Sequence, residues 1–126
     1  MSVVHDASSL LALAFNEPGG AVVRAALRGS LISSVNWLEV VQKVQGRGRD
    51  AGPLRGLFAQ LGMTVEPFAP STAELAARLY FETRQLGLSL GDRACLALGL
   101  EKGWRVYTAD REWSRLTLGI DIRPIR

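Results

Sequence analysis

Apolar residues recur along the chain with two different periods, and the switching between them predicts alternating strands and helices. Five short apolar runs have the length and composition of buried strands, at 1–5, 31–34, 63–68, 104–108 and 120–125. Between these runs apolar residues recur at helical spacing, as at Trp37, Leu38, Val41 and Val44. The alternation predicts an α/β fold, a three-layer sandwich whose central, mainly parallel sheet of about five strands is flanked by helices.

The helices expected between the strands occupy 8–15, 21–27, 35–44, a stretch ending near 62, 71–86, 90–102 and 111–116. Two of them begin with capping-box spacing, from Ser71 to Glu74 and from Ser89 to Asp92. The Gly- and Arg-rich stretch 46–56 is the one segment that we expect to be mobile.

Length and composition predict one domain covering residues 1–126. The chain is 48% hydrophobic, which is enough to build a core. No apolar run approaches the ~20 residues that span a bilayer, and the first residues lack the features of a signal peptide. Cys95 is the only cysteine, which excludes an internal disulfide and a thiolate metal cluster. We therefore expect a cytoplasmic protein with no membrane partner.

The charge balance is mildly basic, with a net charge of +3. Lys43 and Lys102 are the only lysines, and the other basic residues are arginines, which suit bidentate phosphate contacts. The excess is compatible with a polyanionic partner, but also with the codon usage of a GC-rich genome. Charge alone therefore leaves the partner open.

Four acids occupy positions from which they can converge. Asp6 follows the first predicted strand and Asp110 the fourth, and open α/β sheets bind ligands beyond the carboxyl ends of their strands. Asp92 lies at the start of the helix before the fourth strand, and Glu39 lies one turn into the helix after the second. Helices that run antiparallel to the strands begin at the edge where the strands end. We therefore expect all four acids at one edge of the sheet.

Carboxylates gathered in this way repel one another, which raises their pKa values unless a cation neutralises them. An all-oxygen donor set favours Mg²⁺ or Mn²⁺ over zinc, and such ions support phosphoryl-transfer chemistry. Without the four acids, 12 − 4 = 8 acidic residues remain against 15 basic ones. The remaining surface is therefore basic and suits a polyanion.

Each acid also has a purely structural interpretation. Asp6 and Asp110 stand where helix N-caps are expected, and Asp92 can close a capping box that begins at Ser89 and satisfy backbone donors there. Glu39 can pair with Lys43, four residues further along a solvated helix face. Four unrelated structural acids need not meet at one edge of a sheet, however, and this favours the shared site.

The four acids lie in four segments: VVHDAS at 3–8, SSVNWLE at 33–39, LSLGDRACLA at 88–97 and YTADREW at 107–113. These segments resemble the acidic motifs of PIN-domain toxins of the VapC type. Each motif is weak alone, but the four occur in the family's order over the whole chain. The ordered set makes the resemblance specific.

This resemblance implies a PIN-like fold and a divalent-metal-dependent endoribonuclease, the toxin of a type II toxin–antitoxin pair, which cleaves RNA with a metal-activated water. It implies Mg²⁺ or Mn²⁺ as cofactor and catalytic, metal-binding roles for Asp6, Glu39, Asp92 and Asp110. Polar neighbours expected to support these acids are Ser8, Asn36 and Thr108. The implied partners are RNA, a VapB-like antitoxin that reaches into the acidic groove, and a second copy in a homodimer.

His5 departs from the family pattern, which has an apolar strand residue at this position. Adjacent strand residues face opposite ways, so we expect His5 to point away from Asp6 and to pack. Cys95 is interpreted as a small buried filler. Packing is also the preferred interpretation of the tryptophans, Trp37, Trp104 and Trp113. RNA contact and simple solvation remain equal alternatives for Arg47, Arg49 and Arg55.

Other classes of function share some of these features. A receiver-like signalling domain shares the length and the acids, but it needs adjacent acids after its first strand, where this chain has the single Asp6. It also needs an aspartate after its third strand and a lysine after its fifth, where this chain has 68–70 Phe-Ala-Pro and 124–126 Pro-Ile-Arg. A PIN-fold binding module without significant nuclease activity and a nuclease on single-stranded DNA remain alternatives.

Overall fold

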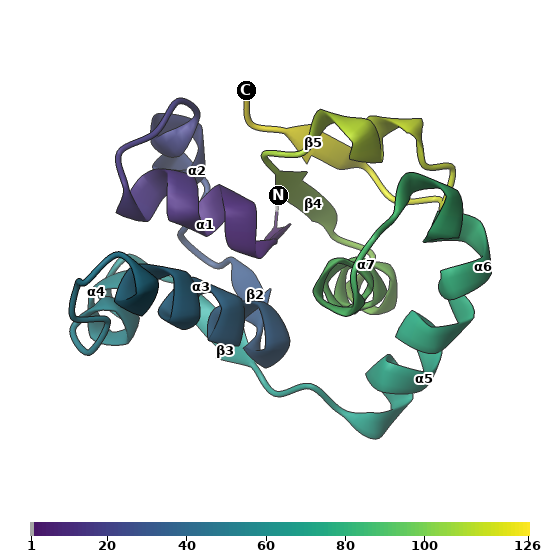
Figure 1. Ribbon diagram of the computed structural model, residues 1–126, viewed down its shortest axis with the longest axis horizontal. Helices are drawn as coiled ribbons and strands as arrows, with labels where there is room; N and C mark the ends of the chain where they lie inside the picture. Colours follow the sequence, from purple (N-terminus) through teal and green to yellow (C-terminus); the bar gives the residue numbers. More distant parts are fainter. Residues whose placement is uncertain (1) are drawn as a thin grey trace.

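Five short strands form the centre of the computed structural model, which describes residues 2–126 (Figure 1). They are β1 (Val3–His5), β2 (Leu31–Ser33), β3 (Thr64–Glu66), β4 (Arg105–Thr108) and β5 (Ile122–Pro124). Their order across the sheet is β3-β2-β1-β4-β5, and every neighbouring pair is parallel. The prediction of a parallel sheet of about five strands is confirmed. Met1, predicted to begin the first strand, lies outside the described residues.

The strand register sorts the side chains onto two faces. Val4 pairs with Leu31 and Val106, and all three pack in one hydrophobic cluster. One position later the pairing moves to the opposite face, where Ile32 packs in a second cluster. Because successive strand residues alternate between faces, a sheet buried on both sides needs apolar residues at consecutive positions. The continuous apolar runs seen in the sequence have this cause.

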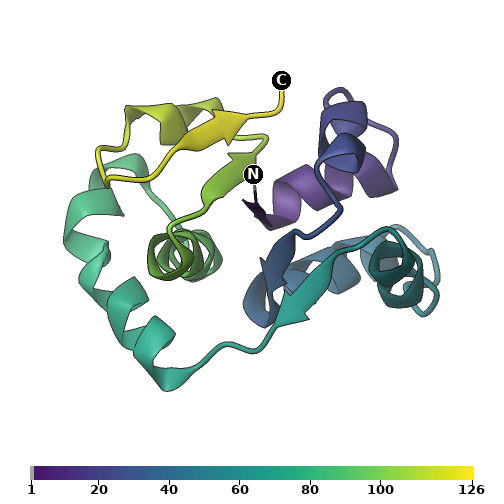
Figure 2. The ribbon, with the colours of Figure 1, turned by 180° about the vertical axis from the view of Figure 1, so that it is seen from behind.

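Helices cover both faces, which makes the fold three-layered (Figures 1 and 2). On one side lie α1 (Ala7–Ala14), α2 (Gly20–Ala25), α3 (Ser34–Gly46) and α4 (Leu54–Gln60). On the other side lie α5 (Pro70–Arg78), α6 (Tyr80–Thr83), the 3₁₀ turn η1 (Arg84–Leu86) and α7 (Leu90–Lys102). A second 3₁₀ turn, η2 (Arg111–Arg115), connects β4 to β5. Within residues 2–126 we find no helix with both the length and the apolar character needed to cross a bilayer.

Helix α7 is the most buried helix, since it contacts α3 and α5 as well as three strands. It begins with the predicted capping box, in which the Ser89 hydroxyl accepts a hydrogen bond from the Asp92 amide and the Asp92 carboxylate accepts one from the Ser89 amide. It ends at Gly103, whose φ of +67° places it in the left-handed region that favours glycine. Cys95 is fully buried on this helix, in keeping with a packing role.

Two details differ from the sequence prediction of 71–86. The helix begins at Pro70 after Ala69, so the proposed capping box at Ser71 does not form. It is also divided into α5, α6 and η1. Near the second break the Thr83 hydroxyl donates to the Leu79 carbonyl at 2.8 Å, a side-chain bond that bends helices.

A further correction concerns α3, where Leu38 was assigned to the apolar face. Its side chain is 62% exposed, whereas Asn36, Val40 and Val44 are buried. Leu38 is two residues from both Asn36 and Val40, and two residues span about 200° of an α-helix. Leu38 therefore points outward once Asn36 points inward. The 46–56 stretch, expected to be mobile, is shorter than predicted, because α3 continues to Gly46 and α4 begins at Leu54.

Candidate functional site

A cavity of about 230 Å³ lies at the carboxyl ends of β1 and β4. All four predicted acids line it, together with other residues from α1, α3 and η2: Asp6, Ala7, Ser8, Leu11, Glu39, Lys43, Asp92, Asp110 and Trp113. The strand order changes direction between β1 and β4. From β1 the chain moves to β2 and β3 on one side, whereas β4 and β5 lie on the other side. Such a switch point leaves a crevice in which open α/β sheets bind ligands.

Asp6 is the most constrained of the four acids. It is 4% exposed and serves as the N-cap of α1, accepting a hydrogen bond from the Ser9 amide at 2.8 Å. The Ser8 hydroxyl lies 2.8 Å from both carboxylate oxygens, and the Thr108 hydroxyl donates at 2.6 Å. Three donors from two distant parts of the chain therefore hold this carboxylate in one orientation.

Burial raises the pKa of Asp6 to about 6, because the charged carboxylate loses its water. Hydrogen bonds from Thr108, Ser9 and Ser8 oppose this effect only in part, and the negative charge of Asp92 adds to it. Folding therefore holds this carboxylate at a cost in free energy that a nearby cation would offset. The raised pKa of Asp6 has the direction expected for a cluster of acids, but its main cause is burial and only a minor part is repulsion between acids.

Glu39 is positioned by a contact between α3 and α7. The amide nitrogen of Asn36 donates to Glu39 Oε1 at 2.8 Å and to the Gly91 carbonyl at 2.9 Å. A Cβ atom built on Gly91 would overlap the carboxylate of Glu39. Glu39 therefore lies directly against the backbone of α7 beside Asp92, and only glycine at position 91 leaves it this space. Nothing in the sequence pattern indicates this role of Gly91.

Asp92 and Asp110 both act as caps. Asp92 accepts the Ser89 amide at 2.9 Å, and Asp110 accepts the Glu112 amide at 2.9 Å. Their structural interpretation is correct, as it is for Asp6, and it does not compete with the shared cavity. A carboxylate has two oxygens and accepts several hydrogen bonds, so a capping acid retains capacity for a ligand.

The donor set suits a hard divalent ion held partly through water. Among residues 2–126, no three carboxylate, imidazole or thiol groups are close enough together to form a complete protein ligand set. Mg²⁺ is usually bound by one or two carboxylates and retains several waters. The buried Asn36 Oδ1 has no hydrogen-bond donor within the same residues, and such an acceptor is available to a water. The residues present thus fit Mg²⁺ or Mn²⁺.

The cavity is also lined by Lys43, for which the sequence suggests a pairing with Glu39. It lies four residues after Glu39 on α3. A cationic side chain in a cavity with four acids offsets part of their repulsion and offers a contact for a phosphate. Trp113, 1% exposed, forms part of the cavity wall and agrees with the packing role assigned to it.

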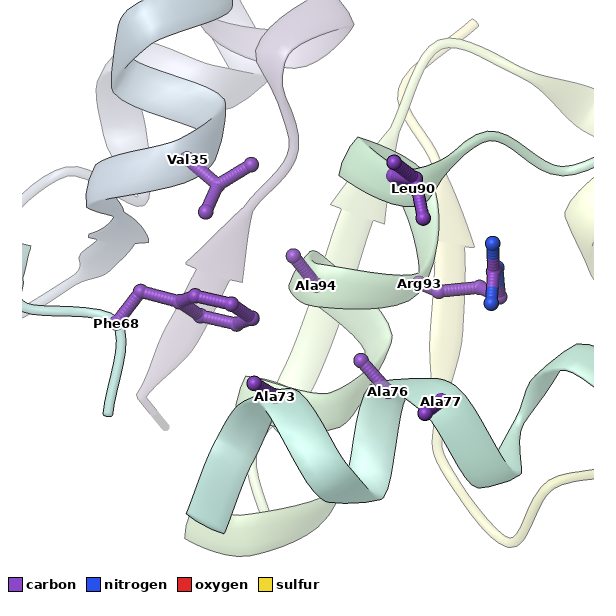
Figure 3. A pocket seen from close by; sticks show the side chains of 8 residues that line it. All are labelled: Val35, Phe68, Ala73, Ala76, Ala77, Leu90, Arg93 and Ala94. Carbon is purple, nitrogen blue, oxygen red and sulfur yellow. The ribbon is translucent and has the colours of Figure 1, made fainter. Parts of the chain in front are cut away.

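A second cavity, of about 340 Å³, lies between α3, α5 and α7 (Figure 3). Its lining is mostly apolar, and Figure 3 shows Val35, Phe68 and Ala94 around its centre with Arg93 at its margin. It contains no carboxylate in its lining, so it does not have the chemistry that the four acids provide.

His5 is fully buried on the face of the sheet opposite Val4. Its Nδ1 lies 3.3 Å from the Ser9 hydroxyl, and its ring meets that of Tyr107 edge to face at 5.8 Å. Burial lowers the pKa of His5 to about 4, with a smaller opposing effect from the Ala26 backbone. The ring is therefore neutral at pH 7 and has the packing role expected from the sequence.

Comparison with known proteins adds a family to this geometry. The model of the PIN domain matches residues 3–118. No protein of curated function matches the chain by sequence. Among solved structures, the chain is similar to a toxin–antitoxin complex from Klebsiella pneumoniae, with a TM-score of 0.79, 17% identity and 98% of each chain covered.

Two further structures are similar over most of their length. VapBC2 from Rickettsia felis, bound to a DNA fragment from its promoter, has a TM-score of 0.73 and 14% identity, with 98% of each chain covered. VapC20 from Mycobacterium tuberculosis, a sarcin–ricin loop cleaving toxin, has a TM-score of 0.71 and 16% identity, with 90% of this chain and 93% of that chain covered. At these identities the likeness shows the fold.

Proposed function

The chain belongs to the PIN-domain family, and from this premise we propose that it is a divalent-metal-dependent endoribonuclease, the toxin of a type II toxin–antitoxin pair. The observation that carries the proposal is the meeting of Asp6, Glu39, Asp92 and Asp110 around one cavity at the switch point of the sheet. These acids come from four separate segments and are all oxygen donors. The substrate of such a nuclease is a phosphodiester, whose hydrolysis depends on positioning and charge neutralisation.

In this proposal the four acids hold Mg²⁺ or Mn²⁺, directly or through bound water, and are the catalytic residues. When bound, the ion would activate the attacking water and neutralise charge on the scissile phosphate. Ser8 and Thr108 keep the Asp6 carboxylate in place through hydrogen bonds of 2.8 and 2.6 Å. Asn36 does the same for Glu39.

Partners follow from the same premise. Several similar structures are VapBC or other toxin–antitoxin complexes, which supports a VapB-like antitoxin that covers the acidic cavity. The name of VapC20 as a sarcin–ricin loop cleaving toxin supports RNA as the substrate. We further propose that the chain acts as a single domain in the cytoplasm and forms a homodimer. Sedimentation as a monomer throughout the micromolar range would contradict the dimer.

The test is RNA cleavage by the purified, antitoxin-free chain with Mn²⁺ or Mg²⁺, compared with EDTA and with Asp92→Asn. Asp50→Asn is the matched control, because Asp50 also caps a turn, by accepting the Gly52 amide at 2.8 Å, but lies outside the cavity. We expect metal-dependent cleavage that is lost in EDTA and in Asp92→Asn and retained in Asp50→Asn.

Other outcomes separate the alternatives. A folded chain that binds Mn²⁺ but cuts no RNA would favour the binding module. Cleavage of single-stranded DNA in place of RNA would make single-stranded DNA the substrate. A chain that binds no divalent ion, measured by calorimetry with Mn²⁺ alone, would refute the metal-site argument itself.

A further inference from the structure

Side chains at the ends of α1 and α3 continue the wall of the acidic cavity. Leu11 and Lys43 line the cavity, and Phe15 and Arg47 each lie four residues further on, at the C-caps of α1 and α3. Residues four apart share a helix face and are separated by about one turn of 5.4 Å. Phe15 and Arg47 are therefore neighbours of the cavity wall, one turn beyond it, where α1 and α3 pack together.

Two arginines meet on the ring of Phe15. The guanidinium carbon of Arg47 lies 3.8 Å from the ring centroid, and that of Arg49 lies 5.3 Å from it. Phe15 itself packs against the core, so it is a fixed platform. We name Lys43, Arg47 and Arg49, together with Phe15, the basic strip. Its arginines come from the stretch for which RNA contact and simple solvation had been equal alternatives.

Lys43 faces the acids of the cavity, but at the arginine end of the strip the positive charges outnumber their acidic partners among residues 2–126. Glu17 lies 3.7 Å from Arg47, but it is shared with Arg126 at 3.5 Å. One carboxylate is thus shared by two guanidinium groups, and Arg49 forms no ion pair with any acid among residues 2–126. Like charges drawn together on one surface raise the local potential and attract an anion. Simple solvation would favour arginines that spread apart.

From this arrangement we infer that the basic strip binds the phosphate backbone of single-stranded RNA as it leaves the acidic cavity, an inference that rests on the proposed ribonuclease function. Lys43 contacts a phosphate next to the scissile one, and Arg47 and Arg49 contact phosphates further along the strand. Arginine suits this role, because its planar guanidinium makes two parallel hydrogen bonds to one phosphate. Phe15 holds Arg47 and reduces the freedom it loses on binding.

The position of the strip favours a nucleic acid over an acidic protein segment. A strand whose scissile phosphate lies in the cavity must carry further phosphates at regular intervals away from it, and the strip begins at the cavity and continues in one direction. Arg55 is not part of the strip, because it lines a separate cavity with Met63 and Thr64. The strip therefore specifies one exit path for the strand.

The test compares two double variants of the full chain with the same change in charge. Arg47→Gln with Arg49→Gln removes the arginines of the strip, and Arg78→Gln with Arg84→Gln is the control. The control is matched, since Arg84 also lies over an aromatic ring, 6.0 Å from the centroid of Phe81. Binding of a labelled, mixed-sequence single-stranded RNA is measured in the Asp92→Asn background against salt concentration.

We expect the strip variant to flatten the slope of log K against log salt by about 1.4, since each phosphate contact on a single strand contributes about 0.7. At about 0.1 M salt this corresponds to binding that is roughly 25-fold weaker. In the active background, KM rises and kcat is unchanged, as expected when binding shared by substrate and transition state is removed. The control variant keeps the wild-type slope.

An unchanged slope and KM in the strip variant, in a chain whose wild type cuts RNA, would overturn the inference and leave the ribonuclease intact. Failure of the wild type itself to bind or cut RNA would instead refute the proposed function. A strip variant that retains RNA binding but no longer binds a polyglutamate peptide would assign the strip to an acidic protein partner and also overturn the inference.

Discussion

Asp6→Asn is expected to make the metal-free protein more stable, although it removes a residue proposed to be essential. The pKa of Asp6 is raised from 3.8 to about 6, and each pKa unit corresponds to about 1.36 kcal/mol. The difference of 6 − 3.8 = 2.2 pKa units means that the ionised carboxylate lowers the free energy of unfolding at pH 7 by about 3 kcal/mol. Asparagine has the same shape and carries no charge.

Part of this gain is offset, because asparagine has one oxygen in place of two. The Ser9 amide can still donate to that oxygen, while the hydroxyls of Ser8 and Thr108 must turn to accept from the new amide nitrogen. The loss of charge-assisted hydrogen bonds reduces the gain. We expect Asp6→Asn to raise the free energy of unfolding by about 1 to 3 kcal/mol at pH 7.

The sign of the effect fixes its pH dependence. A carboxyl group whose folded pKa is raised binds more protons in the folded state between the two pKa values, so wild-type stability falls as pH rises from about 3.8 to about 6. Above this window the loss is complete, and below it both states are protonated. The advantage of Asp6→Asn should therefore be absent near pH 3.8 and full near pH 7.

Urea unfolding in EDTA at a series of pH values measures this difference directly. Addition of Mn²⁺ gives a second test, because an ion bound only by the folded wild type adds about 2.7 kcal/mol at one hundred times its Kd, which closes the gap. An Asp6→Asn protein that is less stable than wild type by the same amount at every pH would refute the reasoning, since burial of the charge would then not be the controlling cost.

Two other substitutions test how the site is held. Gly91→Ala should leave the melting temperature nearly unchanged, because the displaced group is the flexible end of Glu39, but should lower kcat by at least about tenfold as that carboxylate moves. The control Gly56→Ala, with open space around position 56, should lower neither the melting temperature nor kcat. Equal activity of both variants would contradict this role of Gly91. Thr108→Val removes the 2.6 Å hydrogen bond to Asp6. It should lower the free energy of unfolding, measured with urea, by about 1 to 3 kcal/mol and weaken Mn²⁺ binding measured by calorimetry. Unchanged metal affinity would show that Thr108 does not position the carboxylate.

Features governed by neighbouring residues could be predicted from the sequence. The apolar runs and the helical periods indicated the five strands and most helices, because burial on two faces leaves a continuous apolar pattern. The capping box at Ser89 and the glycine end at Gly103 follow from hydrogen bonds within a few residues. The acids after β1 and β4 could be placed at one edge, because parallel strands share a direction.

The tertiary structure decided what depends on contacts between distant segments. Asn36 meets Gly91 across 55 positions, and Thr108 meets Asp6 across 102. No local pattern encodes these distances, so the role of Gly91 was missed. The helical spacing of apolar residues predicts Leu38 on the buried face, but burial of Asn36 at the site turns Leu38 toward solvent.

The basic strip has the same origin. Its arginines stand in a glycine-rich stretch that local rules describe as a loop, and only the packing of α1 against α3 brings Phe15 beneath them. Local propensities act over a few residues, whereas the position of a side chain relative to a distant one depends on how whole elements pack. Sequence therefore determined which elements form and which acids end them, and packing determined which side chains meet.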